Sequence, residues 1–347
     1  MTMTMTMTMK IWVCIVLLSA FCCVSEKVCS QDMHFSQYYA APLYLNPCFA
    51  GASGGSRLIA NYRHQWAGIP GAFVSYAFSF DHNFSRLNSG VGLYVNHDKA
   101  GSGGLSTTNI GVQYNYNITL NRHWAARLGA DVAYRMRKID FSKLVFSDQI
   151  SKDGIAAEST ETPPDGNTAF MDYGAGALLF SEVYWFGTSF HHLTQADQAL
   201  IPGNETKLPL KYSFHAGAKF PLKNNVGRKS EKFVSPTFNF KGQHKFHQLD
   251  VGLYFYSNPI TIGVWYRGIP LAKAYKGGYP NNDAIVVLLG YKLKGLSIGY
   301  SYDVTISWLS VITSYGSHEV SLIYEFNNKN ERKQSGSKRV IIPCPKF

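Results

Sequence analysis

The sequence predicts an all-β protein, a transmembrane antiparallel up-and-down β-barrel of about fourteen strands with a plug or mouth segment at its N-terminus. Apolar residues alternate with polar or small ones over long stretches of the chain. The 347 residues are 46% hydrophobic and 14% aromatic but only 16% charged, whereas soluble domains carry about 25% charged residues. No long apolar run follows residue 30, so a chain that spans a membrane would have to do so as a closed barrel.

The alternation is clearest over residues 124–135, where an apolar face opposes a face of charged and small residues. The charged members of that second face are Arg127, Asp131 and Arg135. Successive side chains of a strand point to opposite sides of the sheet, and a helical period of 3.6 residues does not fit this stretch. Similar alternation predicts strands at 57–66, 71–81, 89–98, 105–119, 122–138, 168–180, 181–192, 210–221, 233–242, 246–257, 259–268, 283–294, 295–305 and 316–326.

The lengths of the connections also favour a membrane barrel. Outer-membrane barrels have short periplasmic turns and longer outer loops. If the first strand starts in the periplasm, the tight turns near Asn121, 181–182, 257–259 and 294–295 all fall on that side. The long connections at 139–167, 193–209, 269–282 and 306–315 all fall outside. The links 82–88 and 222–232 are longer than this rule expects.

The polar face of the predicted strands carries many Gly, Ser and Asn residues, as a crowded lumen would need. Its occasional charges, among them His215, Asp250 and Asp303, suggest ion pairs inside the barrel. Four tryptophans lie near predicted strand ends and are expected to form an interfacial girdle. They are Trp124, Trp185, Trp265 and Trp308.

Residues 1–30 read as a targeting segment rather than as part of the fold. Lys10 precedes an apolar run from Ile11 to Val24, and Val28 and Ser30 offer small residues before a cleavage site at Ser30–Gln31. This is the layout of a secretory signal peptide, and the Met-Thr repeat at the start resembles an upstream extension. Export to the outer membrane is therefore expected, followed by an N-terminal segment at 31–56, the barrel at 57–326 and a tail at 327–347.

Cleavage would remove four of the six cysteines and leave Cys48 and Cys344. Two cysteines in an exported chain can pair, and two unpaired thiols are the alternative. The spacing does not decide between these.

The N-terminal segment 31–56 does not alternate, and Pro42 and Pro47 exclude a central strand. It is nevertheless rich in Tyr, Phe and Leu, which argues against a flexible lead-in. We expect it to pack against the periplasmic mouth or to enter the lumen as a plug.

The formal net charge of +11 is concentrated around 219–232 and in the tail. Such a surface can bind an acidic protein, anionic lipid or nucleic acid, and export argues against nucleic acid. A solvated tail without a partner is the alternative. The candidate basic partner surface comprises Arg228, Lys229, Lys232, Arg332, Lys333, Lys338 and Arg339.

No motif for chemistry stands out. The sequence contains no GxSxG, HExxH or P-loop pattern, so neither a catalytic residue nor a cofactor is predicted. His191–His192 would point to opposite faces of a strand, and His244 with His247 lacks matching ligands, so no metal site is predicted either.

Several stretches resemble one known family. The opening QDMHFSQYYAAPLYLNPCFAG at 31–51 looks like the start of the PorP/SprF proteins. Further matches are RLIANYRHQWAGI, GLYVNHDKAGSGGLSTT, LVFSDQI, GYSYDVTISWL, HEVSLIYEF and the closing CPKF. The motif residues to which the resemblance assigns plug or partner contacts are Phe35, Ser36, Gln37, Tyr38, Tyr39, Pro42, Leu45, Asn46, Pro47 and Gly51. Met33 stands where the family commonly has Pro, and Cys48 where it commonly has Ala, which leaves open whether a Cys48–Cys344 bridge is a family feature.

The resemblance implies a non-enzymatic outer-membrane component of the type IX secretion and gliding machinery of Bacteroidetes. It implies contact with outer-membrane lipid, with periplasmic ring proteins of the PorK/PorN or GldK/GldN type, and with a PorE-type protein. Some members instead serve one secreted adhesin. Two other functions remain as alternatives, an outer-membrane channel or solute transporter and an outer-membrane hydrolase.

Overall fold

The structure is a computed structural model of the whole chain. It describes residues 32–151, 154–155, 159, 165–201, 203–222, 232–269, 281–307, 309 and 311–326. The chain divides after Asp32, and the unit from Met33 onward contains every element discussed below.

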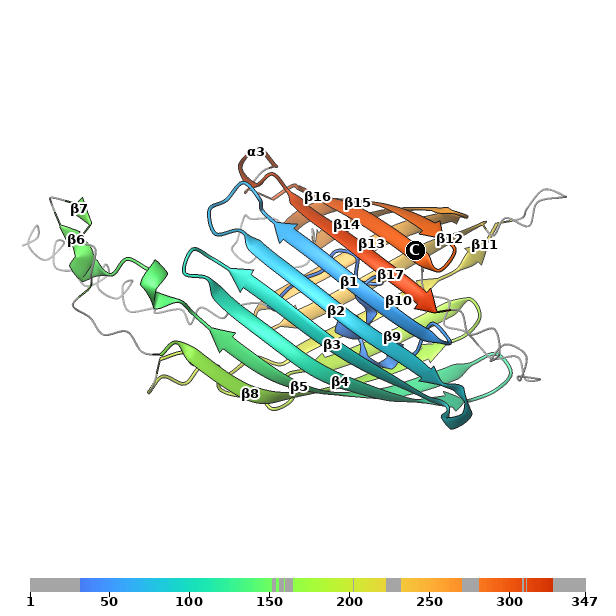
Figure 1. Cartoon of the computed structure of the whole chain (residues 1–347). Coiled ribbons are helices and arrows are strands. Elements are labelled where there is room, and N and C mark those ends of the chain that lie inside the picture. Colours follow the sequence, from blue (N-terminus) through green and yellow to red (C-terminus); the bar gives the residue numbers. More distant parts are fainter. Residues whose placement is uncertain are drawn as a thin grey trace, which may run out of the picture. The chain divides into compact units, whose positions relative to one another are not determined.

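The described chain is a closed antiparallel β-barrel of fourteen wall strands, here called staves (Figure 1). One stave is interrupted at Lys219, so that β10 and β11 both pair with β12. The staves are β1 (Ser56–Gln65), β2 (Phe73–Phe84), β3 (Ser89–Ala100), β4 (Leu105–Thr119), β5 (Ala125–Lys138), β8 (Asn167–Phe180), β9 (Tyr184–His191), β10 (Lys211–Ala218) with β11 (Phe220–Pro221), β12 (Lys232–Gln243), β13 (Phe246–Ser257), β14 (Ile260–Ile269), β15 (Asn281–Leu293), β16 (Leu296–Thr305) and β17 (Ser317–Phe326).

The barrel closes where its first and last strands meet. β1 pairs with β17 in register from Ser56↔Phe326 to Gln65↔Ser317. Each stave is also antiparallel to the staves before and after it in the sequence. This confirms the predicted up-and-down barrel and its fourteen strands.

The two faces of the wall have opposite chemistry. On β17, Val320, Leu322 and Tyr324 point outward and are 38–45% exposed, whereas Glu319 and Ser321 point inward and are fully buried. Soluble proteins do the reverse, because they keep apolar side chains in and charges out. Exposed apolar residues recur around the barrel, as a surface in contact with lipid requires.

The connections differ in length at the two ends of the barrel, with exceptions such as the link 222–231 at one end and the two-residue link 244–245 at the other. At the end where β1 begins, here called the short-turn end, two-residue links join β13 to β14 and β15 to β16. The link predicted to be long at 82–88 is short, because β2 extends to Phe84 and the 3₁₀ turn η2 (Ser85–Leu87) leads into β3. At the opposite, long-loop end lie the connections 139–166, 192–210, 270–280 and 306–316. The first of these carries a small ladder of β6 (Ile150–Ser151) and β7 (Gly154–Ile155).

Short helices occur outside the wall strands. They include α2 (Pro42–Leu45) in the N-terminal segment and α3 (Val311–Ser314) at the long-loop end. No helix in the described part of the chain is both long and apolar enough to cross a membrane.

The predicted tryptophan girdle is wrong for two of its members. Trp185 and Trp265 are buried and face the lumen. Each shares its strand face with a glycine and a polar residue, Gly187 and Ser189 on β9 and Gly263 and Arg267 on β14. Trp308 lies outside the described residues, and Trp124 is half-buried immediately before β5.

An arginine placed on the lipid-facing wall should destabilise the barrel. Val287 lies near the middle of β15, points outward and pairs with Val264 and Tyr302. We expect Val287→Arg to lower the free energy of unfolding in vesicles by about 2–4 kcal/mol, because a charge near the bilayer midplane is poorly solvated. The free energy is measured by unfolding in urea, with the folded fraction at each urea concentration read from heat modifiability on gels. The control is Leu193→Arg in a long loop, which should change the free energy by less than about 0.5 kcal/mol.

Candidate functional site in the barrel lumen

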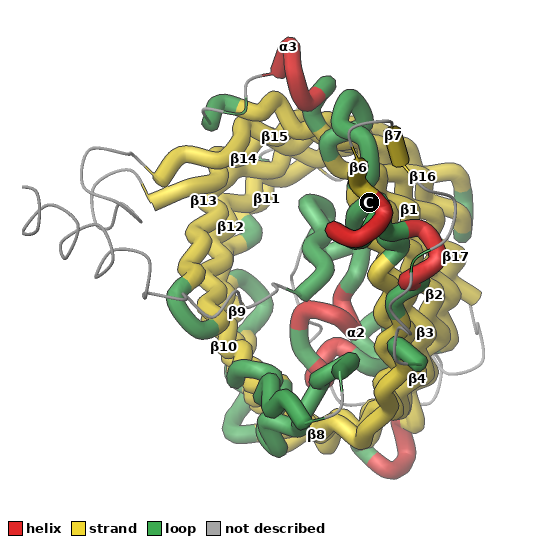
Figure 2. Tube along the Cα trace, turned by 90° about the vertical axis from the view of Figure 1, so that its left-hand side faces the viewer, coloured by secondary structure: helices red, strands yellow, loops and turns green. Residues whose placement is uncertain are grey.

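The N-terminal segment, defined here as residues 33–55, lies inside the ring of strands (Figure 2). Pro42 begins the single turn of α2, and Asn46 caps the following 3₁₀ turn η1 (Pro47–Phe49) by accepting a hydrogen bond from the Cys48 N–H. Proline suits the first position of a helix, and Asn suits its cap. The two prolines therefore shape a compact, coiled segment rather than a strand.

All ten family-motif residues are buried in this segment. Sequence reasoning left open whether they contact a partner or fill the lumen. In this structure their contacts are with the inner wall and with one another. They are Phe35, Ser36, Gln37, Tyr38, Tyr39, Pro42, Leu45, Asn46, Pro47 and Gly51.

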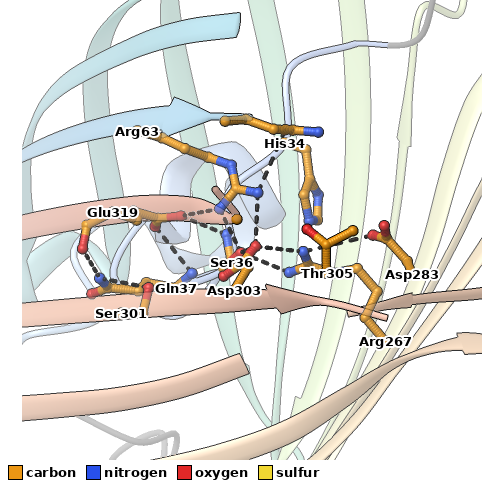
Figure 3. A network of polar contacts seen from close by, with 12 residues as sticks. His34, Ser36, Gln37, Arg63, Arg267, Asp283, Ser301, Asp303, Thr305 and Glu319 are labelled. Atoms are coloured by element: carbon orange, nitrogen blue, oxygen red, sulfur yellow. Dashed lines mark hydrogen bonds and ion pairs between the residues drawn. The ribbon is translucent and has the colours of Figure 1, made fainter. Parts of the chain in front are cut away.

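Ser36 is the centre of a buried ion network (Figure 3). Its hydroxyl donates to Asp303 Oδ2 at 2.6 Å and accepts from Arg63 Nη1 at 2.6 Å and Arg267 Nη2 at 2.7 Å. A hydroxyl has one hydrogen to donate and two lone pairs to accept with. The full hydrogen-bonding capacity of Ser36 is thus satisfied by three charged residues from three strands.

Each arginine of the network pairs with two carboxylates. Arg63 lies 2.8 Å from Asp303 and 3.1 Å from Glu319. Arg267 lies 2.8 Å from Asp303 and 2.9 Å from Asp250. The side chains of these five residues are at most 2% exposed. Buried charges are tolerated only when paired and hydrogen-bonded, so this arrangement is a rigid unit rather than a set of independent groups.

The backbone of the segment is bound to the same network. The Ser36 and Gln37 N–H groups donate to the two carboxylate oxygens of Glu319, at 2.7 and 3.0 Å. The Gln37 side chain donates to Ser301 Oγ at 3.1 Å and accepts from Ser321 Oγ at 2.6 Å. Glu319 is therefore both the partner of Arg63 and the anchor of the segment.

An aromatic cluster fills the middle of the lumen. The Trp185 indole N–H donates to the Tyr39 hydroxyl at 2.9 Å, and the rings of Tyr38 and Trp265 meet edge to face. Asn46 reaches the wall between β8 and β9, where its amide donates to the Thr188 carbonyl at 2.9 Å. The burial of Trp185 and Trp265, which were expected at the lipid interface, is thus explained by their contacts with Tyr39 and Tyr38 of the segment.

A second set of polar contacts holds the segment near the short-turn end. Arg57 pairs with Asp81 at 2.8 Å and donates to the Phe49 carbonyl at 3.3 Å. The Gly51 N–H donates to Asp81 at 3.2 Å. Asn115 donates to the carbonyl of Ala50 at 2.8 Å, which fixes the chain just before β1 begins.

The inner wall is shaped to the segment at two inward glycines. A Cβ on Gly90 would lie 2.1 Å from the Ala50 carbonyl oxygen, and one on Gly176 would lie 2.2 Å from Asn46 Oδ1. Real Cβ atoms do not approach other atoms so closely. The many glycines on the polar strand face therefore include positions where the segment's own atoms occupy the space of a side chain.

Burial shifts the pKa of two titratable groups of the segment toward their uncharged forms. Burial, followed by the positive charges of Arg267 and Lys241, lowers the pKa of His34 well below its ordinary value. Burial raises the pKa of the Cys48 thiol to about 12. Cys48 Sγ donates to the Arg127 carbonyl at 3.4 Å. Cys344 lies outside the described residues, so a Cys48–Cys344 bridge and two unpaired thiols both stay predictions.

The ion pairs expected inside the barrel occur at Asp250 and Asp303. Arg127, Asp131 and Arg135, the charged residues of the 124–135 stretch, have other partners. In the structure Tyr94 donates to Asp131 at 3.0 Å, Arg127 donates to the Cys48 carbonyl at 3.2 Å, and Arg135 lies 3.6 Å from Asp172. All three predicted residues line the lumen, as expected. Arg63, Arg267 and Glu319 were missed, although their inward register on β1, β14 and β17 was available from the alternation.

The histidine pair at the end of β9 also differs from expectation. His192 has a positive φ of 63°, which turns its ring back into the lumen beside His191. Its Nδ1 lies 2.6 Å from Asp172 and 3.1 Å from Arg135. This pair belongs to a lumenal polar network. Within the described ranges, no three His, Cys, Asp or Glu side chains are grouped to hold a metal ion.

Most of the predicted basic surface cannot be placed. Lys232 is exposed at the start of β12, at the short-turn end. The cleavage-site residues Ser30 and Gln31, and also Arg228, Lys229, Arg332, Lys333, Lys338 and Arg339, lie outside the described residues.

The fold and the lumen define an outer-membrane β-barrel with its N-terminal segment buried against the inner wall. The family of type IX secretion system membrane proteins PorP/SprF matches residues 28–324. The chain belongs to this family, which confirms the resemblance seen in its motifs.

Comparison with solved structures finds other barrels at low identity. The Ralstonia pickettii toluene transporter TbuX is 10% identical, with a TM-score of 0.45 over 83% of this chain and 94% of that one. The Acinetobacter baumannii outer membrane protein Omp33 is 8% identical, with a TM-score of 0.39 over 78% and 98%. A Pseudomonas aeruginosa FadL homologue is 12% identical, with a TM-score of 0.38 over 78% and 90%. No match is found among the curated proteins.

Removing one arginine from the network should destabilise the protein more than removing a surface arginine does. In Arg63→Met, Glu319 loses its ion-pair partner at 3.1 Å, and Asp303 loses one of two. We expect the free energy of unfolding to fall by about 3–5 kcal/mol, because an uncompensated buried carboxylate remains. The matched control is Arg86→Met on an exposed turn, which should change it by less than about 0.5 kcal/mol. Equal urea midpoints for the two variants would contradict this account.

Proposed function

We propose that this chain is a non-enzymatic docking component of the type IX secretion and gliding machinery at the outer membrane. The observation that carries the proposal is the family match, which extends over both the lumenal segment and the barrel. Export through the predicted signal peptide would deliver the chain to the periplasm, from which the barrel enters the outer membrane. The short-turn end then faces the periplasm, as in other outer-membrane barrels.

The charge at the short-turn end supports docking there. Four exposed basic side chains at this end form what we call the basic rim: Arg86, Arg122 and Lys294 on connections, and Lys232 at the start of β12. Glu182 is an exposed acid at the same end. The predicted basic stretch 222–232 and the tail after β17 both continue from this same end. An excess of positive charge attracts an acidic surface and speeds association with it.

The partner proposed for this end is a periplasmic ring protein of the PorK/PorN or GldK/GldN type, together with a PorE-type protein. For members that serve one adhesin, the partner would be that secreted protein. In either case the barrel provides a fixed point in the outer membrane, and the contact itself lies outside the lipid.

The alternative of a channel or solute transporter is disfavoured by the lumen. Wall contacts to the segment come from β1, β4, β9, β12, β14, β16 and β17. A hydrolase would need a serine, a histidine and an acid in one place, and the His192–Asp172 pair instead contacts Arg135.

Reversing charges on the basic rim should weaken capture of the ring. The variant Arg122→Glu/Lys294→Glu is expected to retain several-fold less ring protein per barrel, because each change replaces an attraction with a repulsion. The matched control, Lys99→Glu/Lys207→Glu, changes the same charge at the long-loop end. Co-purification from detergent-solubilised membranes at two salt concentrations gives the readout, and the contact should weaken as salt rises.

A second variant addresses the tail. Deletion of residues 327–347 is expected to reduce capture further if the tail extends the basic rim. Unchanged capture and unchanged secretion with both variants would rule out docking through this end.

A further inference from the structure

We infer that the N-terminal segment is a fixed plug, here called the stopper. It closes the lumen of the barrel to solutes along most of its length. This goes beyond docking, because it concerns what the barrel excludes rather than what it binds. It rests on the path of the segment, on the walls it joins and on the fit between the segment and the wall.

The segment runs along the barrel rather than across one mouth. Its last residues contact Arg57 and Asp81, which lie at the start of β1 and near the end of β2. Its first residues contact Arg63 and Asp303, which lie near the opposite ends of their strands. Because β1 runs from the short-turn end to the long-loop end, the segment covers most of the distance between the two mouths.

The segment also joins opposite walls. Within a few residues, Gln37 is bound to Ser301 and Ser321 on β16 and β17, and Tyr38 lies 2.9 Å from Thr237 on β12. On β4, the side-chain amide of Gln113 then donates to the Leu43 carbonyl oxygen at 2.8 Å. Figure 2 shows the segment in the interior of the ring, with strands around it. A passage for solutes beside it would have to break contacts of this kind.

Three features argue that the stopper is fixed. Ser36 has all three hydrogen bonds that its hydroxyl can make, each to a charged side chain. The aromatic rings in the centre are buried against one another. At Gly90 and Gly176 the wall lacks a side chain where the segment passes. Withdrawal would therefore unpair buried charges and open a cavity at the same time.

Cys48 provides a direct measurement. It is fully buried in the segment, and in a Cys344→Ser variant processed at the predicted site it is the only cysteine. A membrane-impermeant maleimide should label the folded full chain far more slowly than the urea-unfolded chain. Labelling of the folded chain at the unfolded rate would overturn the inference.

Planar bilayer recordings test closure itself. The full chain should give no conductance steps, and a variant lacking residues 33–50 should give steps if it folds.

In Gly176→Leu the added side chain enters the space of Asn46, so we expect faster Cys48 labelling and the appearance of conductance. The matched control is Ala177→Leu, which adds the same side chain to the lipid-facing side of β8 and should remain silent and protected. Steady conductance by the full chain, or silence of a folded deletion variant, would overturn the inference.

Discussion

A backbone N–H or C=O group in the hydrocarbon core of a membrane has no water to bind, and the pairing of β1 with β17 is what meets this constraint here. Without that pairing, the sheet would have two open edges in lipid. With it, every stave is hydrogen-bonded on both sides. The rest of the structure follows from closure, because a closed sheet must place one set of alternate side chains in lipid and the other set in the lumen.

The lumen sets the second requirement. Inward strand positions carry Arg63, Arg267, Asp250, Asp303 and Glu319, which are all buried. The arginines and acids pair with one another, and the hydroxyl and backbone N–H of Ser36 add hydrogen bonds to Asp303 and Glu319. A half-satisfied polar network is costly in a dry interior. The segment and the barrel wall are therefore parts of one folded unit.

The wall of the barrel could be predicted from the sequence because lipid makes the alternation strong. On β17 every outward residue from Val320 to Phe326 is apolar, so the period of two can be read directly. The ends of strands were less certain. Ser181 and Tyr184 form a hydrogen-bonded turn, which delays β9 to Tyr184 although the pattern suggested an earlier start.

The contents of the lumen were harder to predict, because they depend on which strands face each other across the barrel. Arg63 and Asp303 are 240 positions apart, and only closure brings them together. Trp185 and Trp265 lie on the inward register, but an aromatic residue near a strand end equally suits a lipid interface. Their burial depends on Tyr38 and Tyr39, whose position no pattern in the segment reveals.

A filled lumen changes what the barrel is suited to do. A transporter uses a polar lumen to conduct its substrate, so it needs the inward groups to be free or hydrated. Here many of those groups are bound to the chain's own residues, and exposed charged side chains lie at the two ends. The basic-rim residues lie on or beside connections between wall strands, and the N-terminal segment holds that wall from inside the barrel. Bracing removes conformational freedom before binding, and a surface that is already ordered loses less entropy when a partner docks. The stopper thus serves an anchoring role better than it serves transport.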